Sequence, residues 1–285
     1  MMLYLPAEMP EGVQTATAGR DGTVRENPVK HRLIQGGAAF GAMVFEFFTP
    51  GIAQIVRAAG AEFLLYDMEH SGAGIDTIKQ QMAWCRGIGL VPLVRVPAAQ
   101  YHFVARVLDA GAMGIMVPMV ESAAQAAEIV AATRYPPKGV RGAGFGMAHD
   151  DYEGGSVAEK IAAILARTQV IVQIETPKGI AAVDEIAALD GVDVLWLGHF
   201  DLTNFMGIPG QFTHPDYLKA VDSILAAARR HGKVAGFMAM DDVWARDYYA
   251  KGFRMMAVGP DQGLLQRSLS RGLGVLREAA QAARR

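Results

Sequence analysis

The chain has 285 residues, with 27 lysine and arginine residues against 29 acidic ones, so its formal net charge is −2. A single α/β barrel commonly occupies about 250 residues. The chain lacks the basic excess of nucleic-acid-binding or polybasic membrane proteins, and it has no apolar run near the ~20 residues that span a bilayer. Its one cysteine, Cys85, excludes an internal disulfide. We therefore expect a cytoplasmic protein that binds neither nucleic acid nor membrane.

The first 30 residues mix proline, glycine, threonine and charged residues without periodicity. They are expected to form an N-terminal extension, either a tail or an arm on a neighbouring subunit, while residues 31–285 form one domain. At the boundary, the sequence NPVKHRLIQGG predicts a short helix that ends at Gly36 and Gly37.

Eight short apolar runs then alternate with amphipathic stretches; the runs are 41–48, 63–69, 91–97, 114–120, 169–175, 193–199, 233–239 and 254–260. Each run fits a parallel strand that is covered on both faces, and eight strand–helix units predict a (β/α)₈ TIM barrel. A doubly wound open sheet is the alternative, but the first strand lacks the glycine-rich turn of that fold. The long interruption at 134–168 is expected to be functional, with His149 as a residue that could reach the site.

Polar residues gather where the predicted strands end, and the opposite ends carry ordinary residues. Barrel enzymes place their chemistry at the carboxyl ends of the strands. The residues at these ends are Asp67, Glu69, His70, Arg95, Gln173, Glu175, His199 and Asp201. This asymmetry between the two rims is the strongest functional signal in the sequence.

Glu175 and Asp201 follow adjacent strands, with Gln173 two residues before the first of them. Two carboxylates without a cysteine ligand favour a hard divalent cation, Mg²⁺ or Mn²⁺, with positions left for water and a chelating substrate. The alternative is that both carboxylates cap the helices that follow them.

Asp67 and His70 share one strand end, where an aspartate bound to one imidazole nitrogen would leave the other free to move a proton. Arg95 is expected to bind a substrate carboxylate or an enolate oxygen, unless it pairs structurally with Glu69 or Asp67. No lysine falls at a carboxyl strand end, which argues against imine chemistry.

With these residues identified, the sequence resembles the HpcH/HpaI aldolases, metal-dependent enzymes of the citrate lyase β-like superfamily that use pyruvate or another 2-oxo acid. The resemblance covers residues 27–275. The matching segments are YDMEH (66–70), VRVP (94–97), VPMVESAAQAAEIVAATRYPPKGVRG (117–142), QIET (173–176), GHFDL (198–202), HPD (214–216) and AVGPD (257–261).

The resemblance implies that the carboxylate pair holds the metal, Mg²⁺ or Mn²⁺ with Co²⁺ as a further candidate. It places Gln173 beside the metal, Arg95 on the pyruvyl oxygen, and His70 with Asp67 as the proton-transfer pair. It also implies a homohexamer, a trimer of dimers with exchanged C-terminal helices.

Two positions depart from the family pattern. Many members read G-P-x-D where this chain has Gly198, His199, Phe200 and then an aspartate, and Phe145 replaces a smaller residue. We expect Gly198, His199 and Phe200 to line the substrate site, with the 143–153 loop as the other candidate for substrate selection.

The expected activity is the cleavage or formation of 4-hydroxy-2-oxo acids through a pyruvate-type enolate and an aldehyde. Three alternatives share part of this signature: an oxaloacetate-type decarboxylase, a malyl- or citramalyl-CoA-type lyase, and a non-catalytic homologue. The loops after the strands show little of the basic cluster that coenzyme A requires.

Overall fold

A computed structural model describes residues 24–284; the predicted extension lies outside the described residues up to position 23. Eight parallel strands pair in chain order, and β8 pairs with β1 to close the barrel. The closed barrel confirms the predicted fold, and the open-sheet alternative is wrong. The strands are β1 (Ala39–Val44), β2 (Phe63–Asp67), β3 (Val91–Arg95), β4 (Gly114–Val117), β5 (Gln169–Ile174), β6 (Val194–Leu197), β7 (Val234–Ala239) and β8 (Met255–Pro260).

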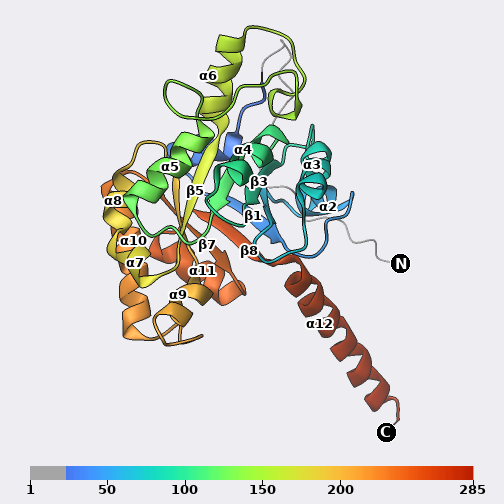
Figure 1. Ribbon diagram of the computed structural model, residues 1–285. Helices are drawn as coiled ribbons and strands as arrows, with labels where there is room; N and C mark the ends of the chain where they lie inside the picture. The colour runs from blue at the N-terminus through green and yellow to red at the C-terminus, as the bar shows by residue number, and fades with distance from the viewer. Residues whose placement is uncertain (1–23, 285) are drawn as a thin grey trace.

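Helices surround the barrel (Figure 1). They are α1 (Pro28–Ile34), α2 (Ile52–Ala58), α3 (Ile75–Trp84), α4 (Tyr101–Asp109), α5 (Ala123–Thr133), α6 (Val157–Arg167), α7 (Pro177–Ala181), α8 (Val183–Ala188), α9 (His199–Phe205), α10 (Pro215–Arg230), α11 (Asp242–Lys251) and α12 (Asp261–Ala282), with a 3₁₀ turn η1 at Ala148–Asp150. Within residues 24–284, no helix is both long and apolar enough to cross a membrane.

The predicted first helix closes the amino-terminal end of the barrel. The Asn27 side chain caps α1 by accepting from the Lys30 N–H, and its Nδ2 donates to the Arg167 carbonyl at 3.0 Å. Val29 and Leu33 pack in the cluster of side chains inside the barrel, so α1 acts as a plug at that end.

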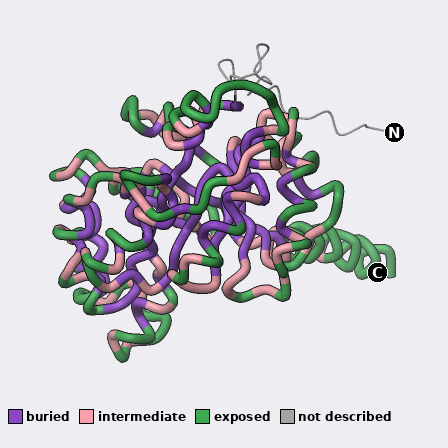
Figure 2. Tube along the Cα trace, turned by 45° about the horizontal axis from the view of Figure 1, so that its top comes forward, coloured by how far each residue is buried: buried purple, intermediate pink, exposed green. Residues whose placement is uncertain are grey.

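The core has two layers. Phe63, Leu65, Leu93, Met116 and Trp196 are among the side chains that fill the barrel interior. A larger cluster lies between the outer faces of the strands and the covering helices. Figure 2 shows the buried residues gathered in the middle of the domain and the exposed ones around it.

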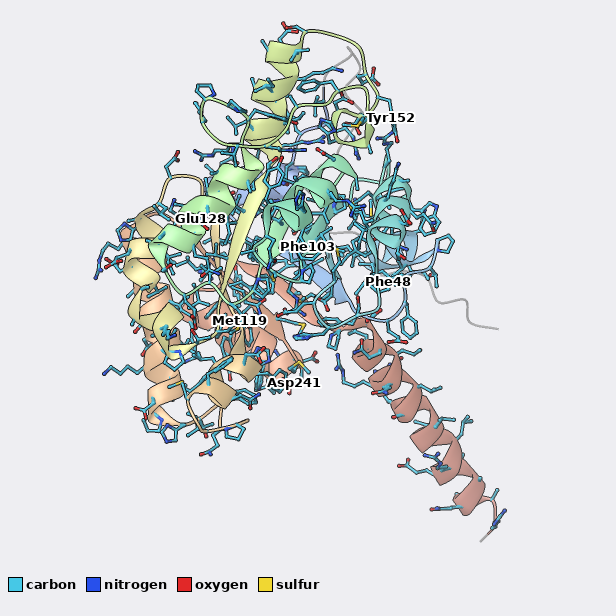
Figure 3. The ribbon with its side chains drawn as sticks, viewed as in Figure 1. Phe48, Phe103, Met119, Glu128, Tyr152 and Asp241 are labelled. Carbon is cyan, nitrogen blue, oxygen red and sulfur yellow. The ribbon has the colours of Figure 1, made fainter. Side chains whose placement is uncertain are left out.

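Strand register brings the polar strand ends together. Asp67 pairs with Arg95 across β2 and β3, and Ile174 pairs with Leu197 across β5 and β6. Because parallel strands point the same way, the residues after these pairs share one rim. Met119 and Asp241, which follow β4 and β7, mark this rim at the lower end of the barrel in Figure 3.

The 134–168 connection lies at the opposite rim, so our expectation that this loop selects the substrate is wrong. It leads from α5 into the amino end of β5, and Tyr152 marks its position at the upper end in Figure 3. A loop that enters a parallel strand must lie at that strand's amino end. Length alone therefore did not indicate which rim the loop serves.

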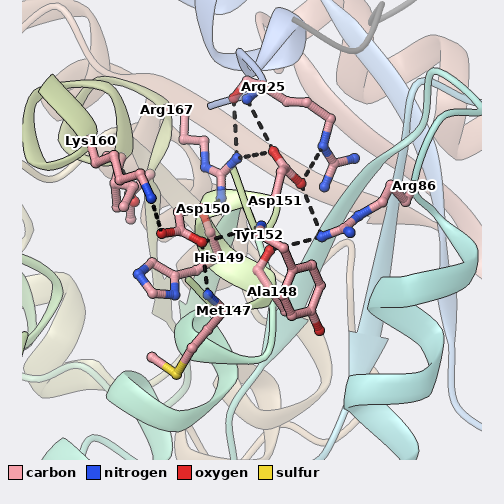
Figure 4. A network of polar contacts seen from close by, with 12 residues as sticks. Arg25, Arg86, Met147, Ala148, His149, Asp150, Asp151, Tyr152, Lys160 and Arg167 are labelled. Atoms are coloured by element: carbon pink, nitrogen blue, oxygen red, sulfur yellow. Dashed lines mark hydrogen bonds and ion pairs between the residues drawn. The ribbon is translucent and has the colours of Figure 1, made fainter. Parts of the chain in front are cut away.

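A buried ionic network holds this connection in place (Figure 4). Asp151 accepts from Arg25 at 2.8 Å and lies 3.1 Å from Arg86, and Asp150 pairs with Lys160 at 2.8 Å. His149 is buried within the same segment, so the suggestion that it reaches the active rim is also wrong.

Helix α12 leaves the barrel after its first turn and projects away from it (Figure 1). Its apolar residues beyond that turn are exposed, including Leu265, Leu269 and Leu276.

Candidate active site

A cavity of about 210 Å³ opens at the carboxyl rim of the barrel. Its walls come from the ends of seven strands and from the first turns of α9 and α12, as expected for a barrel active site. The lining residues are Met43, Phe45, His70, Arg95, Gln173, Trp196, Leu197, Gly198, His199, Phe200, Asp201, Met238, Met240, Pro260 and Gln262.

Arg95 is buried in the cavity wall and held from two sides. Its Nε donates to Asp67 Oδ1 at 2.5 Å, and its Nη1 lies 3.1 Å from Glu69 Oε2. The guanidinium also faces the Phe45 ring at 5.3 Å. Its Nη2 is buried without a hydrogen-bond partner among the described residues. This nitrogen can donate to a ligand oxygen in the cavity.

Asp67 and His70 meet differently from the expected pair. The Asp67 carboxylate accepts from the His70 main-chain N–H at 2.7 Å, whereas the imidazole Nε2 lies 3.7 Å from Glu69 Oε2. No hydrogen bond joins the Asp67 carboxylate to the His70 imidazole within residues 24–284, which corrects that part of the expectation. The reason is local: two residues after a strand end, the chain turns back and presents its N–H groups to the aspartate.

Glu175 is almost fully buried and oriented by its neighbours. Its Oε1 accepts from the Met119 N–H at 2.7 Å, and its Oε2 accepts from Gln173 Nε2. Burial raises the pKa of the Glu175 carboxyl to about 7, and the negative charges of Glu69 and Asp201 add to the rise. Three carboxylates thus crowd one region with a surplus of negative charge.

Gly198 makes room for the Glu175 carboxylate. A Cβ at position 198 would lie 2.3 Å from Glu175 Oε2. We expect Gly198→Ala to displace this carboxylate, lower divalent-metal affinity at least tenfold and cost about 1–3 kcal/mol in stability. Isothermal titration with Mn²⁺ and thermal unfolding measure both. Gly72→Ala is the control, since a Cβ there meets nothing within 4 Å.

The donor set fits a divalent cation of the Mg²⁺ type. Glu175 and Asp201 offer hard oxygen atoms from adjacent strand ends, and Mg²⁺ is typically held by one or two carboxylates plus water and substrate. Within residues 24–284, no group of three or more histidine, cysteine or acidic side chains is arranged to hold a metal by itself. Two carboxylates would supply part of the coordination shell, and a chelating substrate would complete it.

His199 and Phe200 are neighbours in sequence but differ in exposure: the first is buried among aromatic rings, and the second is half exposed. The His199 ring is packed among aromatic rings, 5.2 Å from both Phe237 and Trp244, and burial lowers its pKa to about 4. It is therefore a neutral packing group at physiological pH. Phe200 is half exposed and lines the cavity.

Sequence reasoning missed roles for three residues at this rim. Glu69 was recognised only as a possible partner of Arg95, yet it also lies beside the His70 imidazole. Met119 has a left-handed backbone (φ 56°) that directs its N–H to Glu175, and Gln262 reaches the cavity from the start of α12. The backbone angle of Met119 leaves no mark in residue type.

A closed barrel whose carboxyl rim surrounds a cavity with acidic groups, an arginine and a histidine has the architecture of a barrel enzyme. The profile of the HpcH/HpaI aldolase/citrate lyase family matches residues 43–268, and the chain belongs to this family. It is an enzyme of the aldolase and lyase class.

Named relatives agree with this membership. The chain is 36% identical over 239 residues to a hydroxypyruvate/pyruvate aldolase from Roseovarius nubinhibens, a match that covers 84% of this chain and 92% of the relative. It is also 36% identical over 217 residues to a 5-keto-4-deoxy-D-glucarate aldolase from Klebsiella pneumoniae, covering 76% and 84%.

The fold agrees with solved structures. An HpcH/HpaI aldolase from Desulfitobacterium hafniense superimposes with a TM-score of 0.83 at 31% identity, covering 88% of this chain and 96% of that one. Macrophomate synthase shares the fold at a TM-score of 0.82 and 23% identity, covering 94% of each chain.

Proposed function

We propose that this protein is a divalent-metal-dependent aldolase that cleaves or forms 4-hydroxy-2-oxo acids, with pyruvate or hydroxypyruvate as the donor. The observation that carries this proposal is the unpartnered Arg95 Nη2 buried beside the crowded carboxylates. A 2-oxo acid fits both features, because it offers oxygens to a cation and gains negative charge on its keto oxygen during the reaction.

Glu175 and Asp201 would hold the cation, with Gln173 orienting the first of them. When bound, a divalent cation acts as a Lewis acid toward the 2-oxo acid. In cleavage, His70 takes the proton of the 4-hydroxyl group, the C3–C4 bond breaks, and its electron pair becomes the enolate. Arg95 stabilises the charge on the keto oxygen, and protonation at C3 completes the 2-oxo acid. Condensation reverses these steps.

The remaining residues position the reacting groups. Asp67 fixes Arg95 through the 2.5 Å contact, and Glu69 faces both that arginine and the His70 imidazole. Gly198, His199 and Phe200 form the adjoining wall: the glycine admits Glu175, the histidine ring packs against Trp244 where it meets the cavity, and Phe200 faces the cavity.

Assembly is a second part of the proposal. A trimer of dimers with exchanged C-terminal helices is supported by the family resemblance and by α12, which carries exposed leucines away from the barrel. Leu265, Leu269, Leu273 and Leu276 recur every three or four residues, so they share one face that a second subunit would cover.

Deuterium exchange into the methyl group of pyruvate tests the chemistry without an aldehyde. We expect exchange with added Mn²⁺ or Mg²⁺ and its loss after EDTA treatment, because enolisation needs the Lewis acid. Full exchange after complete metal removal would overturn the metal requirement. Oxaloacetate and a malyl thioester, assayed in parallel, show whether decarboxylation or thioester cleavage is faster than aldol cleavage.

A further inference from the structure

The cavity has two chemically different sides. The ends of β2, β3, β5 and β6 contribute its charged and amide groups, which the proposed chemistry uses. The ends of β1, β7 and β8 contribute Phe45, Met238, Met240 and Pro260, and Phe200 adjoins them. An acceptor aldehyde has to lie on this second side, because the first is committed to the 2-oxo acid.

Within residues 24–284, the second side of the cavity is lined by no lysine or arginine. Among the described residues that line the cavity, Arg95 is the one lysine or arginine, and it is held by Asp67 and Glu69. A carboxylate on the acceptor would be desolvated against methionine and phenylalanine without a cation to pair with. The negative charge of Asp201 in the same cavity adds repulsion.

The Gln262 amide is a polar group of the cavity wall on this side. Asp261 fixes it in place, since its carboxylate accepts the N–H groups of Phe45 and Phe47 at 3.0 and 2.7 Å and so ties the start of α12 to the loop after β1. The Gln262 Oε1 atom is buried and has no hydrogen-bond partner within residues 24–284. A buried acceptor of this kind is stabilised by a ligand O–H group.

We infer that this side is an acceptor subsite that selects uncharged hydroxyaldehydes, with Gln262 binding the acceptor hydroxyl and Phe200, Met238 and Met240 excluding charge. Gln262 and the two methionines are then specificity-determining residues. The inference rests on the proposed aldolase function. It predicts an acceptor without a carboxylate, whereas the dicarboxylic sugar acid in the name of the 5-keto-4-deoxy-D-glucarate aldolases carries a second carboxylate outside its 2-oxo acid part.

Three aldehydes of similar size test it: glycolaldehyde, propanal and glyoxylate, each condensed with pyruvate in the presence of Mn²⁺. We expect kcat/KM for glycolaldehyde to exceed that for propanal by about 3–10-fold, the range of one neutral hydrogen bond. It should exceed that for glyoxylate by at least about tenfold, because an unpaired carboxylate is costly to bury. Equal or better use of glyoxylate by the unaltered enzyme would overturn the inference.

Two variants separate the contributions. Gln262→Leu should bring glycolaldehyde and propanal within about twofold of each other, since the hydroxyl loses its partner. Met240→Lys should raise the glyoxylate-to-glycolaldehyde ratio at least about tenfold by supplying a cation, and Met240→Leu is the matched control that keeps the ratio. An unchanged ratio in Gln262→Leu or Met240→Lys, with the folded state verified by circular dichroism, contradicts the assignment of that residue.

Pyruvate deuterium exchange by the unaltered enzyme distinguishes a failure of the acceptor inference from a failure of the proposed function. Absent exchange in the presence of metal means that the proposed function fails, and the acceptor inference fails with it. Normal exchange without the expected acceptor order means that the enzyme enolises its donor but selects the acceptor by other residues.

Discussion

Replacing His70 with alanine is expected to lower turnover by roughly 10²–10⁴-fold, the usual contribution of a general acid–base group. The His70 side chain is half exposed at the edge of the cavity, and its Nε2 lies 3.7 Å from Glu69 Oε2. It is therefore placed to exchange protons with substrate and solvent. Steady-state cleavage of a 4-hydroxy-2-oxo acid measures the effect.

The same variant should keep its metal and its donor substrate. Glu175 and Asp201 are the proposed ligands, and Arg95 is fixed by Asp67 rather than by the imidazole. Titration with Mn²⁺ and with pyruvate should give dissociation constants within about threefold of the parent values, because no contact to either ligand is removed. Loss of the metal would instead make His70 a ligand. His102→Ala, on α4 and outside the cavity lining, is the control.

The barrel and the polar residues at its carboxyl rim could be predicted from sequence, because they depend on residue types along the chain. A strand buried on both faces requires a short, continuously apolar run, and the parallel topology then places all carboxyl ends together. Asp67, Arg95 and Gln173 stand at or near a strand end, and Asp201 lies in the first turn of the helix that follows β6, so strand positions alone place all four at this rim.

The contacts among these residues could not be predicted in the same way. Whether Asp67 meets the imidazole or the main chain of His70 depends on the turn between them, which residue identity leaves open. The position of Gln262 depends on the angle at which α12 leaves the barrel, a consequence of the Asp261 contacts with the loop after β1. Residue spacing predicts which residues lie at the carboxyl rim, whereas backbone geometry determines which of their side chains are in contact.

The second large effect is expected from Glu175→Gln, which should remove metal binding while stabilising the metal-free protein. Burial raises the pKa of this carboxyl from 4.5 to about 7. Between those values the folded chain binds a proton that the unfolded chain has released, so this group's contribution to stability falls as pH rises through that window. Above it, the cost reaches about 3 kcal/mol. An amide avoids this cost, and its carbonyl oxygen can still accept from Met119.

In EDTA at pH 8, the variant should therefore unfold at a higher temperature than the parent, and near pH 5 the two should converge. Saturating Mn²⁺ should reverse the order at pH 8, because a bound cation stabilises only a chain that can hold it, and aldol activity of the variant should fall at least about 10³-fold. Thermal unfolding from pH 5 to 9, with and without metal, measures both effects.

The control is Glu185→Gln, which changes an exposed carboxylate on α8. If the variant is less stable than the parent in EDTA at pH 8, Glu175 is a structural anchor; if Mn²⁺ stabilises both equally, it is not a ligand. The proposed role requires a variant that is more stable than the parent in EDTA at pH 8, and a parent that Mn²⁺ stabilises more than it stabilises the variant. A buried carboxylate with a raised pKa lowers the stability of the fold, so its presence is explained by what it binds.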